Sequence, residues 1–319
     1  MKLTFEQIKS VTVGSLKTEE RDGGFRFSKH TDSQLDAWKR KSDSLFSNAS
    51  ANTGVRLDFH TNSQNLAFKV LAGQKFEVKL EGLSVACYKL NSGDSVELSL
   101  AEALGIKKDE YRVTLLLPSH GVPAVLEYVE LDDGAYVYPH DFDMKILFVG
   151  DSITQGWESS RDSFSYAYRV SDFFNAESII QGTGGAYFNE ESFERIDFDP
   201  DVVVVAYGTN DFGHYKSYDE LRFHCEAHLS LIAKEYKEKK IFVISPLWRG
   251  GVQEKAMGSF AGCRSVIIET VAKLGLTHID GLTLVPPQPE LFADGYLHPN
   301  DNGFSLYAEN LIRSMEKYL

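Results

Sequence analysis

Hydrophobic and polar residues alternate along the first part of this chain, from about Val11 to Tyr138. A period of two predicts half-buried β-strands. Clusters of Gly, Asn, Asp and Ser separate these segments at a spacing of about ten residues, which is typical of antiparallel sandwiches and jelly rolls. The pattern therefore predicts an all-β sandwich with one short helical turn at 100–104; its clearest strands are 55–59, 66–70, 76–80, 96–100, 111–117 and 125–131.

The pattern changes after Met144 to apolar strands separated by amphipathic segments of helical length. This order predicts parallel βαβ units and a three-layer α/β/α domain with a flavodoxin-like sheet. The expected strands are 145–149, 177–180, 202–206, 241–245 and 277–279, and the expected helices are 163–175, 218–239, 259–274 and 302–318. Polar and turn-forming residues at 132–141 separate the two patterns, so we expect domains at 1–140 and 141–319.

Composition narrows the range of partners. The 319 residues include 43% hydrophobic and 25% charged residues, with a formal net charge of −13. This length favours two domains, and the acidic balance argues against binding to nucleic acids or anionic membranes. Three distant cysteines predict neither a disulfide framework nor a zinc knuckle. The N-terminus lacks a signal-peptide pattern, so a cytoplasmic location is expected; secretion after loss of a leader is the alternative.

The segment KILFVGDSITQGWE, residues 145–158, carries the first candidate for chemistry. Its apolar run predicts a strand buried on both faces, and the run ends at Gly150-Asp151-Ser152. Ligands of open α/β sheets bind beyond the carboxyl ends of the strands. Ser152 is therefore a candidate nucleophile, although an ordinary turn would also explain the three residues.

A serine nucleophile needs a base, and His298 is the best candidate among the nine histidines. It lies in a loop before the last predicted helix, and Pro299 restricts the backbone beside it. Asp294 is close enough in the sequence to accept a hydrogen bond from the ring and select its tautomer. A solvated loop histidine is the structural alternative.

Two further loops offer donors for an oxyanion. The amide of Asn210 follows the third strand, and the glycine-rich loop 182–185 follows the second. The N–H of Ser152 itself, at the start of a helical turn, is a third donor. Tight packing, a phosphate loop or a helix cap would also explain these loops, but the G-x-G-x-x-G spacing and a Walker lysine are missing.

A competing hypothesis is a metal site at His224 and His228, which are spaced i, i+4 on a predicted helix beside Cys225 and Glu226. The spacing places both rings on one face of the helix. However, the helix is amphipathic and the HExxH order is absent, so this hypothesis is the weaker one.

Together these blocks resemble the SGNH, or GDSL-type, esterase and lipase superfamily. The resemblance covers about residues 144–319; its four blocks match 150–154, the glycines at 184–185, Gly208-Thr209-Asn210-Asp211 and the loop 294–299. It implies that Ser152 attacks the acyl carbonyl with His298 as general base. The implied oxyanion donors are Ser152, Gly185 and Asn210, and neither a metal nor another cofactor is implied.

One position departs from the family pattern. The family places its aspartate three residues before the histidine, whereas Asp294 lies four residues before His298 and Gly295 occupies the usual place. We favour Asp294 as the partner of the imidazole. A backbone carbonyl is the alternative and would make a Ser-His dyad, as in some carbohydrate esterases that this chain resembles.

The order of a β-sandwich followed by an SGNH domain is similar to bacterial carbohydrate esterases. It implies short acyl esters, most simply O-acetyl groups of a saccharide, as substrates. Aromatic residues of the crevice loops are candidates for stacking on sugars or for packing between domains: Trp157, Tyr187, Phe188, Phe212, Tyr215, Trp248 and Tyr296. A lipase or lysophospholipase, and an inactive carbohydrate-binding protein, remain alternatives.

Overall fold

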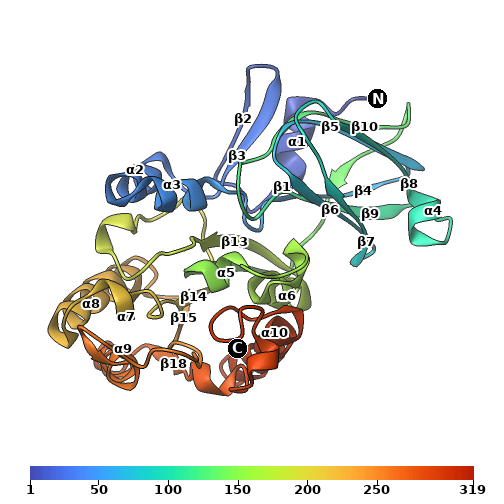
Figure 1. Cartoon of the computed structure of the whole chain (residues 1–319). Helices are drawn as coiled ribbons and strands as arrows, with labels where there is room; N and C mark the ends of the chain where they lie inside the picture. The colour runs from blue at the N-terminus through green and yellow to red at the C-terminus, as the bar shows by residue number, and fades with distance from the viewer.

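Two antiparallel sheets form the front part of the computed structural model, which describes residues 1–319 (Figure 1). One sheet has the order β1-β4-β9-β6-β7 with β11 beside β4; the strands are β1 (Thr12–Val13), β4 (Arg56–Thr61), β6 (Lys75–Leu80), β7 (Leu83–Lys89), β9 (Tyr111–Leu116) and β11 (Tyr138–Pro139). The other has the order β2-β3-β10-β5-β8; its strands are β2 (Lys17–Arg21), β3 (Gly24–Ser28), β5 (Asn65–Ala72), β8 (Ser95–Ser99) and β10 (Val125–Leu131).

Alternate residues of these strands meet in one core. Leu66, Phe68 and Val70 of β5 are fully buried and pack in the same cluster as Leu57 and Phe59 of β4, which belong to the opposite sheet. The predicted β-sandwich is therefore confirmed, as is the helical turn α4 (Leu100–Leu104). A jelly-roll connection of the strands stays a prediction.

Three further helices in the front part were not predicted: α1 (Phe5–Val11), α2 (Asp32–Lys41) and α3 (Asp43–Ser50). The expectation of a single helical turn in this region was wrong. Thr31 caps α2 through a capping box with Gln34, and Ser42 caps α3. These helices are short and mostly polar, so their apolar periodicity was too weak to be recognised.

The second part is built on a parallel sheet of the order β13-β12-β14-β15-β18. In chain order this is 2-1-3-4-5, the flavodoxin-like arrangement that was predicted. The strands are β12 (Met144–Gly150), β13 (Ala176–Gly182), β14 (Val202–Ala206), β15 (Lys240–Ile244) and β18 (Thr277–Ile279). The short hairpin β16 (Glu254–Lys255) and β17 (Gly258–Ser259) lies between β15 and the next helix.

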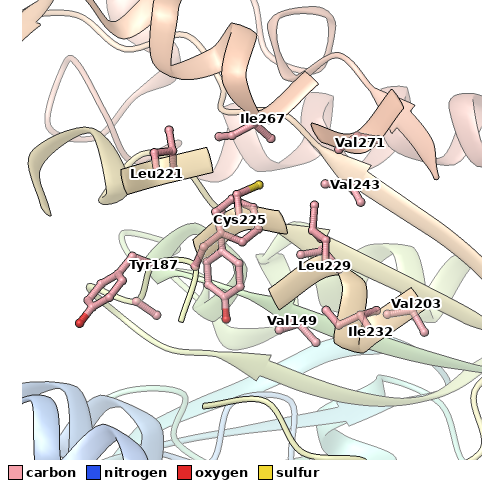
Figure 2. Close-up of a cluster of buried hydrophobic side chains, with 14 of the residues drawn as sticks. Val149, Tyr187, Val203, Leu221, Cys225, Leu229, Ile232, Val243, Ile267 and Val271 are labelled. Atoms are coloured by element: carbon pink, nitrogen blue, oxygen red, sulfur yellow. The ribbon is translucent and has the colours of Figure 1, made fainter. Parts of the chain in front are cut away.

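Helices cover both faces of the parallel sheet (Figure 1). The helices are α5 (Ser152–Gln155), α6 (Tyr166–Phe173), α7 (Asp211–His214), α8 (Tyr218–Glu235), α9 (Phe260–Lys273) and α10 (Asp301–Met315). On one face α8 and α9 pack on Val149, Val203 and Val243 (Figure 2). On the other face α6 and α10 pack on Ile146 and Phe148. The three-layer prediction is confirmed.

The front part also contributes to the core of the second. Between β13 and β14 the chain forms only a single 3-10 turn, η2 (Glu190–Ser192), and no α-helix. Trp38 of α2 and Ala49 of α3 occupy this space and belong to the same buried cluster as Val149 and Ile179 of the parallel sheet. The α2–α3 hairpin therefore completes the layer that α8 and α9 begin.

Polar side chains join the two parts elsewhere. Lys79 Nζ donates a hydrogen bond to Asp172 Oδ2 at 3.1 Å, and the backbone N–H of Ser119 donates to Asp162 Oδ2 at 3.2 Å. The chain passes from the front sheet to the parallel sheet between Pro139 and Met144. The division into domains at 1–140 and 141–319 stays a prediction. None of the helices has the length and apolar character needed to span a bilayer.

Candidate active site

Ser152 lies at the carboxyl end of β12, the strand at which the order of the sheet reverses. It is the first residue of α5, and the side chain of Asp151 caps this helix by accepting from the N–H of Ile153 at 2.9 Å. The first N–H groups of a helix have no partner within it, so the Ser152 N–H points out of the turn. Only 7% of Ser152 is exposed.

The structure brings His298 to Ser152 although 146 positions separate them in the sequence. Ser152 Oγ and His298 Nε2 are 2.9 Å apart, and His298 Nδ1 lies 2.8 Å from Asp294 Oδ2. An ionised carboxylate can only accept, so the ring carries its proton on Nδ1. Nε2 is then free to accept from the serine hydroxyl.

Asp294 is held by its own loop. Its Oδ1 accepts hydrogen bonds from the N–H groups of Tyr296, Leu297 and His298 at 3.0, 2.7 and 3.1 Å. Partial burial would raise the pKa of Asp294, but these N–H groups and the His298 ring outweigh it and hold the pKa below its ordinary value. The extra residue in the loop, Gly295, lies in the left-handed region with φ +77° and lets the chain turn back toward the carboxylate.

The two other predicted donors lie on neighbouring loops. Asn210 Nδ2 donates to the carbonyl of Ala186 at 2.9 Å, which uses one of its two N–H bonds and ties the loop after β14 to the loop after β13. Asn210 does not cap α7 with its side chain. Gly185 is exposed and has φ +85°. Both residues therefore follow strands that flank β12, as expected, while their roles stay predictions.

Two buried carboxyl groups, those of Asp151 and Asp211, lie next to Ser152 and Asn210 in the sequence. Burial raises the pKa of Asp151 and of Asp211 to about 7, and the carboxylate of Asp211 further raises the pKa of Asp151. Asp211 Oδ1 accepts from the N–H of Phe188 at 2.9 Å, while its Oδ2 has no partner. Asp211 therefore links the start of α7 to the loop after β13.

Several residues at the site were not recognised from the sequence. Gln155 contacts the glycine loop, and its Oε1 accepts from the N–H of Gly184 at 2.6 Å. His120 of the front part packs edge-on against Trp157, whose ring lies 6.3 Å from that of His298. Burial lowers the pKa of His120 to about 4. Gln155 directly follows the serine block 150–154, and this position was the one signal in the sequence that could have pointed to it.

The predicted crevice aromatics divide into two groups. Phe188 and Phe212 are fully buried, and Tyr187 and Tyr215 are nearly so, all within the core cluster beneath α8 and α9. These four residues therefore pack in the core of the α/β domain, and among them Tyr187 also packs edge-on against Trp38 of the front part. Trp157, Trp248 and Tyr296 keep exposed surface, and Trp157 lies against the His298 ring. The two groups differ in how far their side chains are buried, and this difference could not be predicted from the sequence.

The histidines of the competing metal hypothesis face different surroundings. His224 Nδ1 lies 2.8 Å from Glu190 Oε2, whereas His228 is buried with its Nδ1 3.0 Å from the carbonyl of Asn189. Cys225 lies in the hydrophobic core between them. No group of three or more His, Cys, Asp or Glu side chains in the structure could hold a metal ion.

Comparison with known proteins agrees with the geometry. Residues 148–306 match the GDSL-like Lipase/Acylhydrolase family, which confirms the resemblance seen in the sequence. This segment contains Ser152, Asn210 and His298. No curated protein sequence matches the chain.

Solved structures share the whole two-part architecture. A salicylyl-acyltransferase from a tetracycline biosynthetic pathway has a TM-score of 0.83 and 17% identity, over 96% of this chain and 94% of that one. A putative GDSL-like lipase from Bacteroides ovatus has a TM-score of 0.75 and 21% identity, over 99% and 97%. A family two carbohydrate esterase from Cellvibrio japonicus has a TM-score of 0.71 and 16% identity, over 99% and 97%. At these identities the likeness establishes the fold.

Proposed function

Residues 148–306 are a GDSL-like lipase/acylhydrolase domain, and on that premise we propose that this chain hydrolyses short-chain acyl esters, with O-acetyl groups of saccharides as the substrate class. The observation that carries the proposal is the series Ser152, His298, Asp294, whose hydrogen bonds measure 2.9 and 2.8 Å. Nucleophile, base and orienting carboxylate stand in the order that acyl transfer requires.

In the proposed mechanism Ser152 Oγ attacks the acyl carbonyl while its proton passes to His298 Nε2. Asp294 stabilises the imidazolium that results. The oxyanion is stabilised by the N–H groups of Ser152 and Gly185 and by the free N–H of the Asn210 amide. The C–O bond to the alcohol breaks and His298 returns the proton to the leaving oxygen. Water then repeats the sequence on the acyl-enzyme and releases the acid.

Two features support a saccharide ester over a lipid ester. The family two carbohydrate esterase from Cellvibrio japonicus has the same fold over 99% of this chain. The net charge of −13 disfavours approach to an anionic lipid surface. A lipase or lysophospholipase is distinguished by a chain-length series, because its activity would rise steeply beyond about eight acyl carbons rather than fall.

The decisive experiment compares the parent with Ser152→Ala and His298→Ala on p-nitrophenyl acetate. Each variant should lose at least about 10³-fold in kcat. Ser92→Ala, an exposed serine of the front part, is the matched control and should retain full activity. Unchanged hydrolysis by Ser152→Ala would refute the mechanism. A parent that neither hydrolyses the ester nor reacts with a fluorophosphonate would favour the inactive binding protein.

Acyl transfer to an alcohol is a second candidate, because the salicylyl-acyltransferase has the same fold over 96% of this chain. Both reactions share the acyl-enzyme and differ only in the acceptor. Hydrolysis of p-nitrophenyl acetate in rising methanol separates them. A hydrolase should release mainly acetate, whereas a transferase should form mainly the methyl ester at low methanol concentrations.

A further inference from the structure

Side chains from both parts of the chain hold Gly184, the residue before the predicted oxyanion donor. Its N–H donates to Gln155 Oε1 at 2.6 Å, and its carbonyl oxygen accepts from Asn48 Nδ2 of α3 at 2.9 Å. A Cβ at this position would lie 2.8 Å from Trp157 Nε1 and 2.9 Å from Asn48 Nδ2. Only glycine fits between these groups, so the loop is clamped on both sides.

The clamp on the Gly184 carbonyl also fixes the Gly185 N–H. These two groups belong to one peptide unit, and in a planar trans peptide they point in opposite directions. The structure contains no cis peptide bond. Because the oxygen is directed at Asn48 on α3, the N–H is directed away from α3. It has no hydrogen-bond acceptor within the chain, and Gly185 is exposed.

Besides Asn48, the side chain of Gln155 also connects Gly184 to the front part. Its Nε2 donates to the carbonyl of Ser119 at 2.7 Å and to the carbonyl of Asn48 at 3.3 Å. Its Oε1 also accepts from Trp157 Nε1 at 3.2 Å. The buried amide of Gln155 therefore uses all its hydrogen-bonding groups to hold Gly184 against α3.

We propose that Asn48 is a positioning residue for catalysis, which orients the Gly185 N–H toward the developing oxyanion. The front part then supplies a piece of the active site and is more than an appended binding module. This inference rests on the proposed ester hydrolysis, since it names what sets the geometry of one of its donors. A preorganised donor stabilises the transition state more than the substrate, so its loss lowers kcat.

The test is Asn48→Ala, with Asn48→Asp as the second variant. Asn48→Ala removes the donor, and Asn48→Asp keeps the size but places a second acceptor against the Gly184 oxygen. Both should lower kcat for p-nitrophenyl acetate by about 10- to 100-fold with KM changed less than about threefold. The matched control is Asp172→Ala, which removes the contact with Lys79 between the same two parts and touches neither glycine.

A thionoester separates positioning from a general loss of structure. Sulfur is a poorer hydrogen-bond acceptor than oxygen, so the parent should hydrolyse the ester faster than p-nitrophenyl thionoacetate. Both Asn48 variants should bring this ratio at least about fivefold closer to one, while Asp172→Ala should leave it unchanged. An unchanged kcat or an unchanged ratio in folded Asn48→Ala would overturn the proposal and leave ester hydrolysis standing.

Phosphonylation of Ser152 by a fluorophosphonate gives an independent measurement, because its phosphoryl oxygen occupies the same donors. Asn48→Ala should react about 10-fold or more slowly than the parent and Asp172→Ala should not. A parent that labels but does not hydrolyse esters would refute the proposed function, and the labelling rates would still decide the role of Asn48. A parent that does neither would overturn both.

Discussion

The carboxylate of Asp294 serves two different partners. Its Oδ1 accepts hydrogen bonds from three backbone N–H groups of its own loop, and its Oδ2 accepts one from His298 Nδ1. The loop is therefore shaped around the same side chain that selects the tautomer of the ring. This arrangement favours the aspartate over the backbone carbonyl that the irregular spacing left open.

Asp294→Asn separates the two tasks. The amide oxygen can still accept from the loop N–H groups, but the amide nitrogen would face Nδ1 as a donor. The ring would then carry its proton on Nε2 and could not accept from Ser152, so kcat should fall by about 10²- to 10⁴-fold. Steady-state kinetics with p-nitrophenyl acetate measures this. Activity within threefold of the parent would favour the dyad with a backbone carbonyl.

The raised pKa of Asp211 predicts that the free energy of unfolding depends on pH. Burial raises its pKa in the folded state to about 7, whereas the unfolded chain releases the proton near pH 4, roughly the ordinary value for Asp. The folded state thus binds the proton more tightly. This carboxyl stabilises the fold below about pH 4, and that contribution is lost as the pH rises to about 7.

Asp211→Asn removes this titration while its oxygen can still accept from Phe188. The free energy of unfolding of the variant, minus that of the parent, should therefore rise with pH between 5 and 7 by up to about 1.4 kcal/mol per unit. Urea unfolding at several pH values measures the difference, with the exposed Asp36→Asn as control. A difference that stays constant with pH would contradict the assignment.

The end of β13 and the turn of α5 approach each other unusually closely. A Cβ at Gly182 would lie 2.3 Å from the backbone nitrogen of Gln155, so neither element could stay in place. Gly182→Ala should lower the free energy of unfolding by at least about 2 kcal/mol. Gly213→Ala is the control, because its Cβ would meet only the flexible end of Lys255. Chemical denaturation of both variants measures the contrast.

Long periodic elements were predictable from the sequence alone. The parallel strands are continuous apolar runs because they are buried on both faces, and β12 was recognised for this reason. Ser152, His298 and Asn210 could be placed because each follows a recognisable strand or loop block. Their meeting at one edge follows from the parallel order of the sheet.

The α2–α3 hairpin and Asn48 could not be predicted in the same way. Trp38 is 2% exposed, yet the helix around it is mostly polar, and its partner surface lies more than a hundred positions away in the sequence. Packing at such a distance leaves little periodic signal near the residue itself. The role that we assign to Asn48 depends on one contact between the two parts, which sequence spacing does not encode.

The two parts of the molecule share a core and are not independent bodies joined by a linker. Besides Trp38 and Ala49, the buried Lys29 crosses the interface and donates to Gly182 O at 2.9 Å and to Thr53 Oγ1 at 2.7 Å. Each of these contacts lies close to the β13 edge of the parallel sheet. The stability of the α/β domain should therefore depend on the front part.

A chain of residues 141–319 tests this dependence. Without α2 and α3, the apolar face around Val149 and Ile179 would be exposed to water. Truncating one buried Trp typically costs about 3–5 kcal/mol, which is a large share of a domain's stability. We expect this chain to aggregate or to lack cooperative thermal unfolding in calorimetry. Cooperative unfolding together with native esterase activity would contradict a shared core.

The α2–α3 hairpin also has a consequence for synthesis. The hairpin leaves the ribosome long before the strands that it covers. The nascent chain therefore exposes Trp38 to water while β12 and β13 are still being made. Its contacts are distant in sequence, and such contacts form late. The newly made protein should therefore be most vulnerable to proteases and most in need of chaperones at this stage. The α2–α3 hairpin would reach its final packing only after β12 and β13 have left the ribosome.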